Sequence, residues 1–507
     1  MKIEEMIAAK RADCSGCEAC ANICPKKAIT MTRDAEGFAY PKIDPELCIR
    51  CGKCDATCPA LNFKPKTVEA LPSTFTAIYD NDKVLRRSSS GGVFTALSEI
   101  ILSEGGIVFG AGYDKNWHAV HTSAKNLDEL ENLRGSKYVQ SKIGDVYRQV
   151  KSALKSTKVL FTGTPCQCAA LKHFLGGDPE NLLTVEIVCH GVPSPKLWES
   201  YIDAVGYAHE ITYVTFRSKR NGWGGRGLSF IDINFSDKER ILSANSANPY
   251  GKLFLRNVTL RPSCSSCKFR YPNTQSDLSL GDAWGIPDFD PEMFDTRGVS
   301  VVFIHTDKGR NFFERMNLKT KPVRFADAVR NNKLFIMPTV ADSRRKKFFA
   351  ELAKSNDWPA VLKKYFAQDE TEFRKASVKK TGAIFSKNLQ AILEPIRQKF
   401  PKKFLVVSST RDRAAQESLV NFFRQKIKKS ALYFLLPKEG GKFICREDFS
   451  GANFAFKDLD ALNDFVKRFG ITKVRVEKDL NFGDNTAAVT EWLKTCGLPT
   501  KLFVQKN

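Results

Sequence analysis

Two cysteine runs near the start of the chain are the residues whose spacing most clearly suits a chemical task. Each run reads Cys-x2-Cys-x2-Cys-x3-Cys-Pro, and together they contain eight of the 15 cysteines. In two-cluster proteins with this spacing, three neighbouring thiolates bind one [4Fe–4S] cube and the fourth cysteine ligates the other cube. The sequence therefore predicts two clusters, one on Cys14, Cys17, Cys20 and Cys58, the other on Cys48, Cys51, Cys54 and Cys24.

Two other uses of cysteine fit these runs less well. Structural zinc takes paired ligands separated by a longer loop, not triplets followed by Cys-Pro. A disulfide scaffold needs an oxidising compartment, and Met1–Lys10 has acidic residues but no apolar leader segment. We therefore expect a bacterial ferredoxin-like module over residues 1–64 that carries single electrons. Its short strands are expected at Ala28–Thr32 and Phe38–Ile43.

Four later cysteines could hold a third [4Fe–4S] cluster: Cys166, Cys189, Cys264 and Cys267. The first two follow expected strands at Lys158–Thr162 and Leu183–Val188. A helix between such strands implies that they are parallel, and open α/β sheets bind ligands at the edge where these strands end. The Cys-x2-Cys pair at 264–267 could complete the set, but such a pair also fits half a zinc site or a redox dithiol. Spacing alone leaves the third cluster open.

A Ser/Gly run opens an expected helix in the middle of the chain. Ser88–Gly92 precedes apolar residues at Val93, Leu97 and Ile101, which have helical spacing. Backbone N–H groups and the helix dipole at such a start favour an anion, and glycines let a phosphate come close. Serines also cap helices without binding any ligand, so both interpretations stay open at this point.

Several segments, in their order along the chain, resemble one known family: Ser88–Gly92, Gly135–Ser141, Gly163–Gln167, Val188–Ser194, Cys264–Cys267 and Leu280–Gly285. With the cysteine runs, they resemble the beta subunit of the coenzyme F420 (deazaflavin) hydrogenase/dehydrogenase family, preceded by its ferredoxin module. The resemblance covers about residues 1–367. It implies that residues 70–367 form an α/β domain with FAD and at least one [4Fe–4S] cluster, which exchange electrons.

The resemblance also implies roles for particular residues. The FAD diphosphate would contact Ser89, Ser90, Gly91 and Gly92. The flavin would be lined by Lys137, Tyr138, Gln140 and Ser141, and approached by the backbone of Gly163 and Thr164. The third cluster would be ligated by Cys166, Cys189, Cys264 and Cys267. Lys137 is the expected catalytic residue, because its charge would stabilise the anionic reduced flavin ring.

A basic, glycine-rich segment at Phe216–Gly227 is a candidate for substrate recognition. Its Arg217, Lys219, Arg220 and Trp223 could receive an anionic substrate. An ordinary exposed hairpin explains the segment about as well.

Charge and hydropathy limit the classes of partner. The net charge is +23, and residues 341–400 contain 14 Lys/Arg against 7 Asp/Glu. Such a surface attracts acidic proteins, so we expect an acidic electron-transfer protein (ferredoxin or flavodoxin) or another redox subunit as partner. A solvated helix face would explain the charge equally well. No nucleic-acid motif accompanies it and no apolar run could span a bilayer, so we expect a cytoplasmic protein that binds no nucleic acid.

The C-terminal part departs from the family. Residues 368–400 are expected to be a basic linker, and residues 401–507 a small Rossmann-like α/β unit of unknown role. Its strands are predicted at Phe404–Ser409, Ala431–Leu436, Lys473–Val476 and Lys501–Val504. The end of this unit resembles the N-terminal half of two-domain glycosyltransferases, but glycosyl transfer is not predicted.

The whole sequence thus predicts a multidomain protein of mixed α/β and α+β class that works as an oxidoreductase. It would pass electrons between ferredoxin-type clusters and FAD to reduce or oxidise an organic two-electron substrate. The alternative is an electron-relay subunit of a larger redox or polysaccharide-biosynthesis complex, without turnover of its own.

Overall fold

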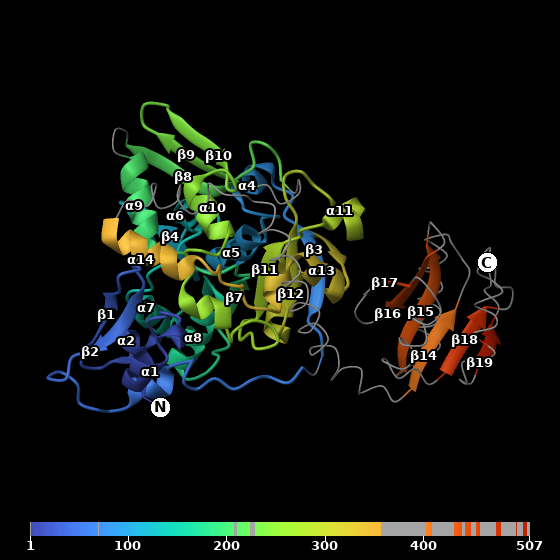
Figure 1. The fold of residues 1–507 in the computed structure, drawn as a ribbon, viewed down its shortest axis with the longest axis horizontal. Helices are drawn as coiled ribbons and strands as arrows, with labels where there is room; N and C mark the ends of the chain where they lie inside the picture. The colour runs from blue at the N-terminus through green and yellow to red at the C-terminus, as the bar shows by residue number, and fades with distance from the viewer. Residues whose placement is uncertain are drawn as a thin grey trace. The chain divides into compact units, whose positions relative to one another are not determined.

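The computed structural model describes residues 2–68, 70–206, 210–223 and 229–355, and beyond them Leu493 and six C-terminal strands (Figure 1). The chain divides into two compact units. The first comprises residues 1–66, 72–323 and 331–388, and the second comprises residues 67–71, 324–330 and 389–507. The ferredoxin-like module and the central domain thus share one unit. The predicted linker at 368–400 lies outside the described residues.

The N-terminal module is built around a short hairpin. Its elements are α1 (Ile3–Ala9), η1 (Arg11–Asp13), α2 (Ala19–Ile23), β1 (Ile29–Arg33), β2 (Ala39–Ile43) and α3 (Lys53–Thr57). β1 and β2 are antiparallel, with Ile29 opposite Ile43. Gly37 has a φ of 89°, which the tight turn between the strands requires and glycine adopts without strain. The two predicted strands are therefore confirmed.

The module is attached to the central domain through buried polar contacts. The Glu18 carboxylate accepts the backbone N–H groups of Ile143 and Gly144, at 2.9 and 3.0 Å. Arg148 donates in the opposite direction, to the carbonyl oxygens of Ala21 and Asn22 at 3.0 and 2.7 Å. In Figure 1 the module lies beside α7 and α8, which α2 contacts. Because the charged groups are satisfied across the boundary, the two parts form a single packed body.

An eight-stranded mixed sheet forms the central domain, in the order β13-β3-β12-β11-β7-β6-β4-β5. The strands are β3 (Ser73–Ile78), β4 (Ile107–Tyr113), β5 (Ala119–Ala124), β6 (Val159–Gly163), β7 (Leu182–Ile187), β11 (Leu278–Asp282), β12 (Ser300–Ile304) and β13 (Lys319–Pro322). Neighbours among β4, β6, β7 and β11 are parallel, and the remaining pairs are antiparallel. The parallel arrangement predicted for the strands before Cys166 and Cys189 is confirmed.

Helices cover both faces of this sheet. The helices of this unit are α4 (Asp82–Arg87), α5 (Val93–Ser103), α6 (Leu127–Leu133), α7 (Val146–Ala153), α8 (Pro165–Leu175), α9 (Pro195–Val205), α10 (Pro249–Leu255), α11 (Ile286–Phe289), α12 (Asp307–Arg315) and α14 (Arg345–Ser355). A further helix, α13 (Phe325–Asn331), falls almost wholly within residues 324–330 of the second unit. Leu160 packs in a core with residues of α5, whereas its neighbours Val159 and Phe161 pack with α7 and α8. Successive strand residues point to opposite faces, so the strand is buried on both sides.

The first unit also contains a second, three-stranded antiparallel sheet. It contains β8 (Ile211–Ser218), β9 (Phe230–Phe235) and β10 (Arg240–Ala244). The start of the predicted glycine-rich segment belongs to β8, with Phe216 fully buried. Short 3-10 turns complete the unit: η2 (Pro262–Ser266), η3 (Pro291–Met293) and η4 (Lys333–Phe335).

The second unit contains a six-stranded sheet, in the order β17-β16-β15-β14-β18-β19. Its strands are β14 (Lys402–Val407), β15 (Ser430–Lys438), β16 (Lys442–Glu447), β17 (Asn453–Phe456), β18 (Lys473–Glu477) and β19 (Thr500–Phe503). The four predicted strands are confirmed, and they pair with one another in parallel. β16 and β17, which the sequence did not predict, extend the sheet as an antiparallel edge.

Among the helices that the structure describes, none combines the length and apolar character needed to cross a bilayer.

Candidate functional site

The predicted ligands of the first cluster surround one hollow in the N-terminal module. Cys14, Cys17 and Cys20 line it from the first run, and Cys58 joins them from the second. Burial raises the pKa of the Cys17 and Cys20 thiols, and the neighbouring thiols add to this effect. Four thiolates could share this hollow only around a positively charged centre, as an iron cluster provides. The residues present therefore fit a [4Fe–4S] cube.

The predicted ligands of the second cluster lie toward the surface. Cys51 is exposed, and Cys54 sits on α3, where burial and then Asp55 raise its pKa. Cys24 ends α2, and its Sγ accepts the backbone N–H of Ala28 at 3.3 Å. Leu47 and Ile49, on either side of Cys48, are 52% and 58% exposed. This end of the module is therefore the part that another protein could reach.

The four later cysteines also line one hollow: Cys166, Cys189, Cys264 and Cys267. Cys166 lies in the first turn of α8, and Cys189 follows the C-terminal end of β7. Cys264 lies in η2, where its Sγ accepts the backbone N–H of Val192 at 3.4 Å. The structure thus brings together all four residues that the sequence set apart as a third group.

Arg270 gives an independent indication of what this third hollow can hold. Its side chain is buried and lines the hollow, and one guanidinium nitrogen donates to the carbonyl oxygen of Cys189 at 2.5 Å. A further donor, Nε, is buried and has no hydrogen-bond partner among the described residues. A buried cation with an unused donor suits an anionic occupant, such as a cluster held by four thiolates.

No three His, Cys, Asp or Glu side chains within the described part of the chain converge closely enough to hold a single metal ion. A cube bonds its cysteines at separate corners, so its ligands stand apart around the hollow.

A large cavity, about 920 Å3, lies at the C-terminal ends of β6, β7 and β11. The third hollow shares its wall with this cavity at Thr164, Cys189, Gly191 and Val192. Ser15, in turn, lines both the first and the third hollow. The two cysteine-lined hollows and the large cavity therefore form a continuous row.

Eight of the ten predicted cofactor contacts line the large cavity: Ser89, Ser90, Gly92, Lys137, Tyr138, Ser141, Gly163 and Thr164. The other two lie elsewhere. Gly91 packs against β12, where its N–H donates to Ser300 Oγ at 2.9 Å. The Gln140 side chain faces the N-terminal module and donates to the carbonyl oxygen of Ser15 at 3.1 Å. The expectation that Gln140 lines the flavin is corrected accordingly.

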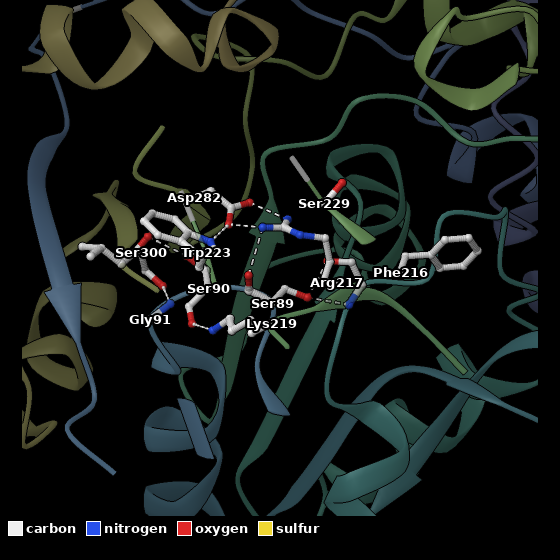
Figure 2. Close-up of polar contacts among 12 residues, drawn as sticks. Ser89, Ser90, Gly91, Phe216, Arg217, Lys219, Trp223, Ser229, Asp282 and Ser300 are labelled. Atoms are coloured by element: carbon white, nitrogen blue, oxygen red, sulfur yellow. Dashed lines mark hydrogen bonds and ion pairs between the residues drawn. The ribbon is translucent and has the colours of Figure 1, made fainter. Parts of the chain in front are cut away.

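Two basic side chains, Arg217 and Lys219, bind backbone carbonyl groups of the Ser/Gly run (Figure 2). Arg217 forms a two-pronged ion pair with Asp282, at 2.6 and 2.8 Å, and donates to the carbonyl oxygen of Ser89 at 3.0 Å. Lys219 Nζ donates to the carbonyl oxygen of Ser90 at 2.7 Å. Because these carbonyl groups are fixed by buried charges, the run keeps one conformation at the cavity wall.

These contacts change the interpretation of the basic segment. Asp282 neutralises Arg217, and backbone carbonyl groups of Leu85, Ser90 and Arg297 surround the Lys219 ammonium group. The remaining two residues are also engaged: Arg220 pairs with Asp232 at 3.2 Å, and Trp223 donates to Asp282 at 3.0 Å. Of the two interpretations that the sequence left open, substrate recognition is therefore the less favoured, because all four side chains are engaged by other groups of the protein and only Arg217 lines the cavity.

Lys137 lies at the cavity, and no carboxylate of the described residues is in contact with it. Its Nζ donates to the carbonyl oxygens of Asn132 and Arg134, at 2.7 and 3.0 Å, and lies 5.7 Å from the centre of the Tyr113 ring. Burial lowers the pKa of Lys137 to about 7. Near neutral pH this side chain can therefore either keep or release a proton.

The sequence missed a buried histidine in the same wall. Gln167 Nε2 donates to Ser141 Oγ at 3.1 Å, and this hydroxyl lies 2.9 Å from His121 Nδ1. His121 Nε2 lies 3.1 Å from the carbonyl oxygen of Thr162, which can only accept, so Nε2 carries the proton. Burial lowers the pKa of His121 to about 4, so the ring is neutral at pH 7. No spacing signal links His121 to these partners.

Three family descriptions match the chain. Residues 13–62 match the 4Fe-4S dicluster domain, residues 74–148 the N-terminal part and residues 156–324 the C-terminal part of the coenzyme F420 hydrogenase/dehydrogenase beta subunit. One of the subunits of the F(420)H(2) dehydrogenase of Methanosarcina mazei is 25% identical over 322 residues, which cover 59% of this chain and 81% of the relative. An uncharacterised protein of Methanocaldococcus jannaschii is 24% identical over 336 residues, covering 60% of this chain and 86% of that protein.

A chain of the F420-reducing [NiFe] hydrogenase complex from Methanosarcina barkeri is similar in structure, with a TM-score of 0.37 and 18% identity. The match covers 54% of this chain and 94% of that chain. The cysteine-lined first hollow agrees with the dicluster match, and both family matches fall on the domain that carries the large cavity. The chain is therefore an iron–sulfur electron-transfer protein that belongs to the family of coenzyme F420 hydrogenase/dehydrogenase beta subunits.

Proposed function

We propose that the chain is an oxidoreductase that carries FAD and three [4Fe–4S] clusters and acts on an organic two-electron substrate. The observation that carries this proposal is the row of hollows with shared walls. Twelve cysteines would hold the clusters, and the large cavity would hold FAD. FAD would exchange an electron pair with the substrate and single electrons with the neighbouring cluster.

The order of the sites suggests where electrons pass. The surface cluster of Cys24, Cys48, Cys51 and Cys54 would exchange electrons with a partner protein. The first cluster would follow, and then the cluster at Cys166, Cys189, Cys264 and Cys267, whose hollow opens onto the FAD cavity. Ser15 marks the contact between these last two cluster sites.

The chain's own residues would orient FAD and control its charge. Ser89, Ser90 and Gly92 line the cavity at the start of α5, where backbone N–H groups favour a diphosphate. While its amine is protonated, Lys137 would stabilise negative charge on the reduced flavin. Since burial already lowers the pKa of Lys137 to about 7, a nearby negative charge would favour its charged form.

A second candidate function is an electron-relay subunit that turns over only within a complex. The exposed Leu47 and Ile49 beside Cys48 favour it, because large apolar side chains beside a redox centre suit a small protein contact. In either case, we propose that the partner is a redox protein or subunit that delivers or accepts single electrons.

Anaerobic purification of the whole chain tests both candidates. The proposal predicts about twelve iron atoms and about one FAD per chain, and reduction of an added organic acceptor by the reduced protein alone. A preparation with about eight iron atoms and no flavin would contradict the FAD oxidoreductase. Full cofactor content without turnover, restored by a co-purifying redox protein, would favour the relay subunit.

A further inference from the structure

Arg261 is a charged residue buried between the N-terminal module and the central domain. Its side chain is 1% exposed. Nε donates to the carbonyl oxygen of Cys14 at 2.9 Å, and the two terminal nitrogens donate to Gln140 Oε1 at 3.0 Å and to the carbonyl oxygen of Ala39 at 2.9 Å. One of these nitrogens also lies 3.9 Å from Cys14 Sγ. The guanidinium group therefore touches a predicted ligand of the first cluster.

The local backbone is shaped to admit this side chain. Gly16, between Cys14 and Cys17, has a φ of +66°, and a Cβ built on it would lie 2.5 Å from a guanidinium nitrogen of Arg261. Any larger residue at position 16 would push the guanidinium away from the cysteines. The Tyr40 ring covers another side of the group, with its centre 4.3 Å from Cζ.

Arg261 has no carboxylate partner among the described residues. The buried acid in this region, Glu18, interacts with Arg261 electrostatically but makes no ion-pair contact with it; its carboxylate accepts the N–H groups of Ile143 and Gly144. Apart from Cys14 Sγ, the guanidinium group contacts carbonyl groups, an amide oxygen and aromatic rings. A buried cation in such surroundings is unfavourable unless an anion lies nearby. A cluster bound by four thiolates at Cys14, Cys17, Cys20 and Cys58 would be that anion.

The same residue also reaches the third hollow through its backbone. The Arg261 N–H donates to the carbonyl oxygen of Val192 at 2.9 Å, and the Arg261 carbonyl oxygen accepts the N–H of Cys264 at 3.0 Å. The backbone of Arg261 is therefore hydrogen-bonded to Cys264 of the third hollow, and its side chain is hydrogen-bonded to Cys14 of the first hollow.

We propose that Arg261 is a positioning residue that raises the reduction potential of the first cluster. Reduction adds one negative charge to the cluster site, and a fixed cation in a buried environment stabilises that charge more strongly than water would. Net charge and hydrogen bonds near the cluster are known determinants of its potential. The proposal rests on the ligand assignment for the first cluster, but it does not depend on FAD or on the third cluster.

Potentiometric titration of the anaerobic full-length protein, followed by electron paramagnetic resonance, tests this role. In Arg261→Gln the equilibrium constant for reduction of the first cluster should fall by about tenfold or more, which is about 59 mV for a one-electron couple. Arg261→Lys, which keeps the charge, should stay closer to the wild-type potential. The matched control is Arg148→Gln, since Arg148 also donates to module carbonyl groups but is paired with Asp145 at 2.9 Å and partly exposed. A shift in Arg261→Gln no larger than in this control would overturn the proposal.

A second variant decides the question if Arg261→Gln does not assemble its clusters. Gln140→Glu places a carboxylate against Arg261. The carboxylate neutralises the charge of the guanidinium group, and Arg261 keeps its hydrogen bonds. This variant should also lower the potential of the first cluster, and an unchanged potential would overturn the proposal. If the wild-type protein itself shows no signal from a first cluster, the ligand assignment fails rather than the role of Arg261.

Discussion

Replacing Arg217 tests whether the cavity wall depends on its buried ion pair. The side chains of Arg217 and Asp282 are 6% and 14% exposed, and Arg217→Gln leaves Asp282 with the Trp223 N–H but without its cation. Removing one partner of a buried ion pair lowers the free energy of unfolding by about 3–5 kcal/mol. The control Arg220→Gln removes a cation that is 57% exposed. Its partner Asp232 is 3% exposed but keeps Arg240 and the Ser218 hydroxyl, so the loss of unfolding free energy should be about 1 kcal/mol or less.

If the large cavity holds FAD as proposed, the same substitution should weaken its binding, because Arg217 also donates to the carbonyl oxygen of Ser89. A hydrogen bond from a charged donor contributes about 1.5–3 kcal/mol. Without this hydrogen bond the Ser/Gly run would have to be ordered when FAD binds, so the affinity for FAD should fall by about tenfold or more. Arg217→Lys should recover only part of the loss, because an ammonium group cannot reproduce the two-pronged contact.

Urea unfolding followed by tryptophan fluorescence measures the first effect, since Trp223 and Trp284 stack at 5.6 Å beside the pair. FAD titration of the flavin-free protein measures the second effect. A double variant, Arg217→Met with Asp282→Leu, should recover much of the lost stability, because no unpaired charge remains. Equal stability and equal FAD affinity in Arg217→Gln and Arg220→Gln would refute the reasoning.

Three further outcomes are expected. Cys264→Ala should remove about four of about twelve iron atoms and leave the signals of the two module clusters intact, as iron analysis and paramagnetic resonance would show. Lys137→Met should abolish a gain in stability that the wild type shows between about pH 7 and about pH 10, because burial lowers the pKa of Lys137 to about 7 and the unfolded chain then binds more protons. Urea midpoints of both proteins across this range provide the measurement. Leu47→Ser with Ile49→Ser should slow reduction by a partner protein but not by dithionite, and equal slowing by both would contradict a docking role.

The sequence was most informative where the chemistry needs a fixed spacing. The two runs from Cys14 to Cys58 follow from cube geometry, and the cysteines after β6 and β7 follow from the way parallel strands end at one edge. Each of these predictions uses residues that are close in sequence or lie on neighbouring strands. Local rules of this kind do not depend on contacts with the rest of the fold.

Contacts between distant segments could not be predicted in this way. Arg261 meets Cys14 and Gln140, and Arg217 meets Asp282, over separations that carry no periodic signal. For the basic segment the sequence left a substrate site and an ordinary hairpin equally open, because the partners of its charges could not be identified from the sequence. Gln140 was assigned to the flavin by its motif, but its side chain turns toward the N-terminal module.

The C-terminal sheet shows the same limit on a smaller scale. The four parallel strands contain apolar runs and were predicted, whereas β16 and β17 were not. The Gly440–Gly441 pair between β15 and β16 is a typical hairpin signal that could have revealed the first of them.

The contacts of Glu18 and Arg148 across the module boundary have a consequence for the speed of internal electron transfer. Separate electron carriers must diffuse together and orient before each transfer, which makes their rates sensitive to solvent viscosity. In this chain hydrogen bonds of Glu18 and Arg148 hold the module in place, so the tunnelling distance between the clusters proposed for the first and third hollows would be set once, on folding. Added glycerol should therefore slow the arrival of an external donor but not the transfer between these two sites.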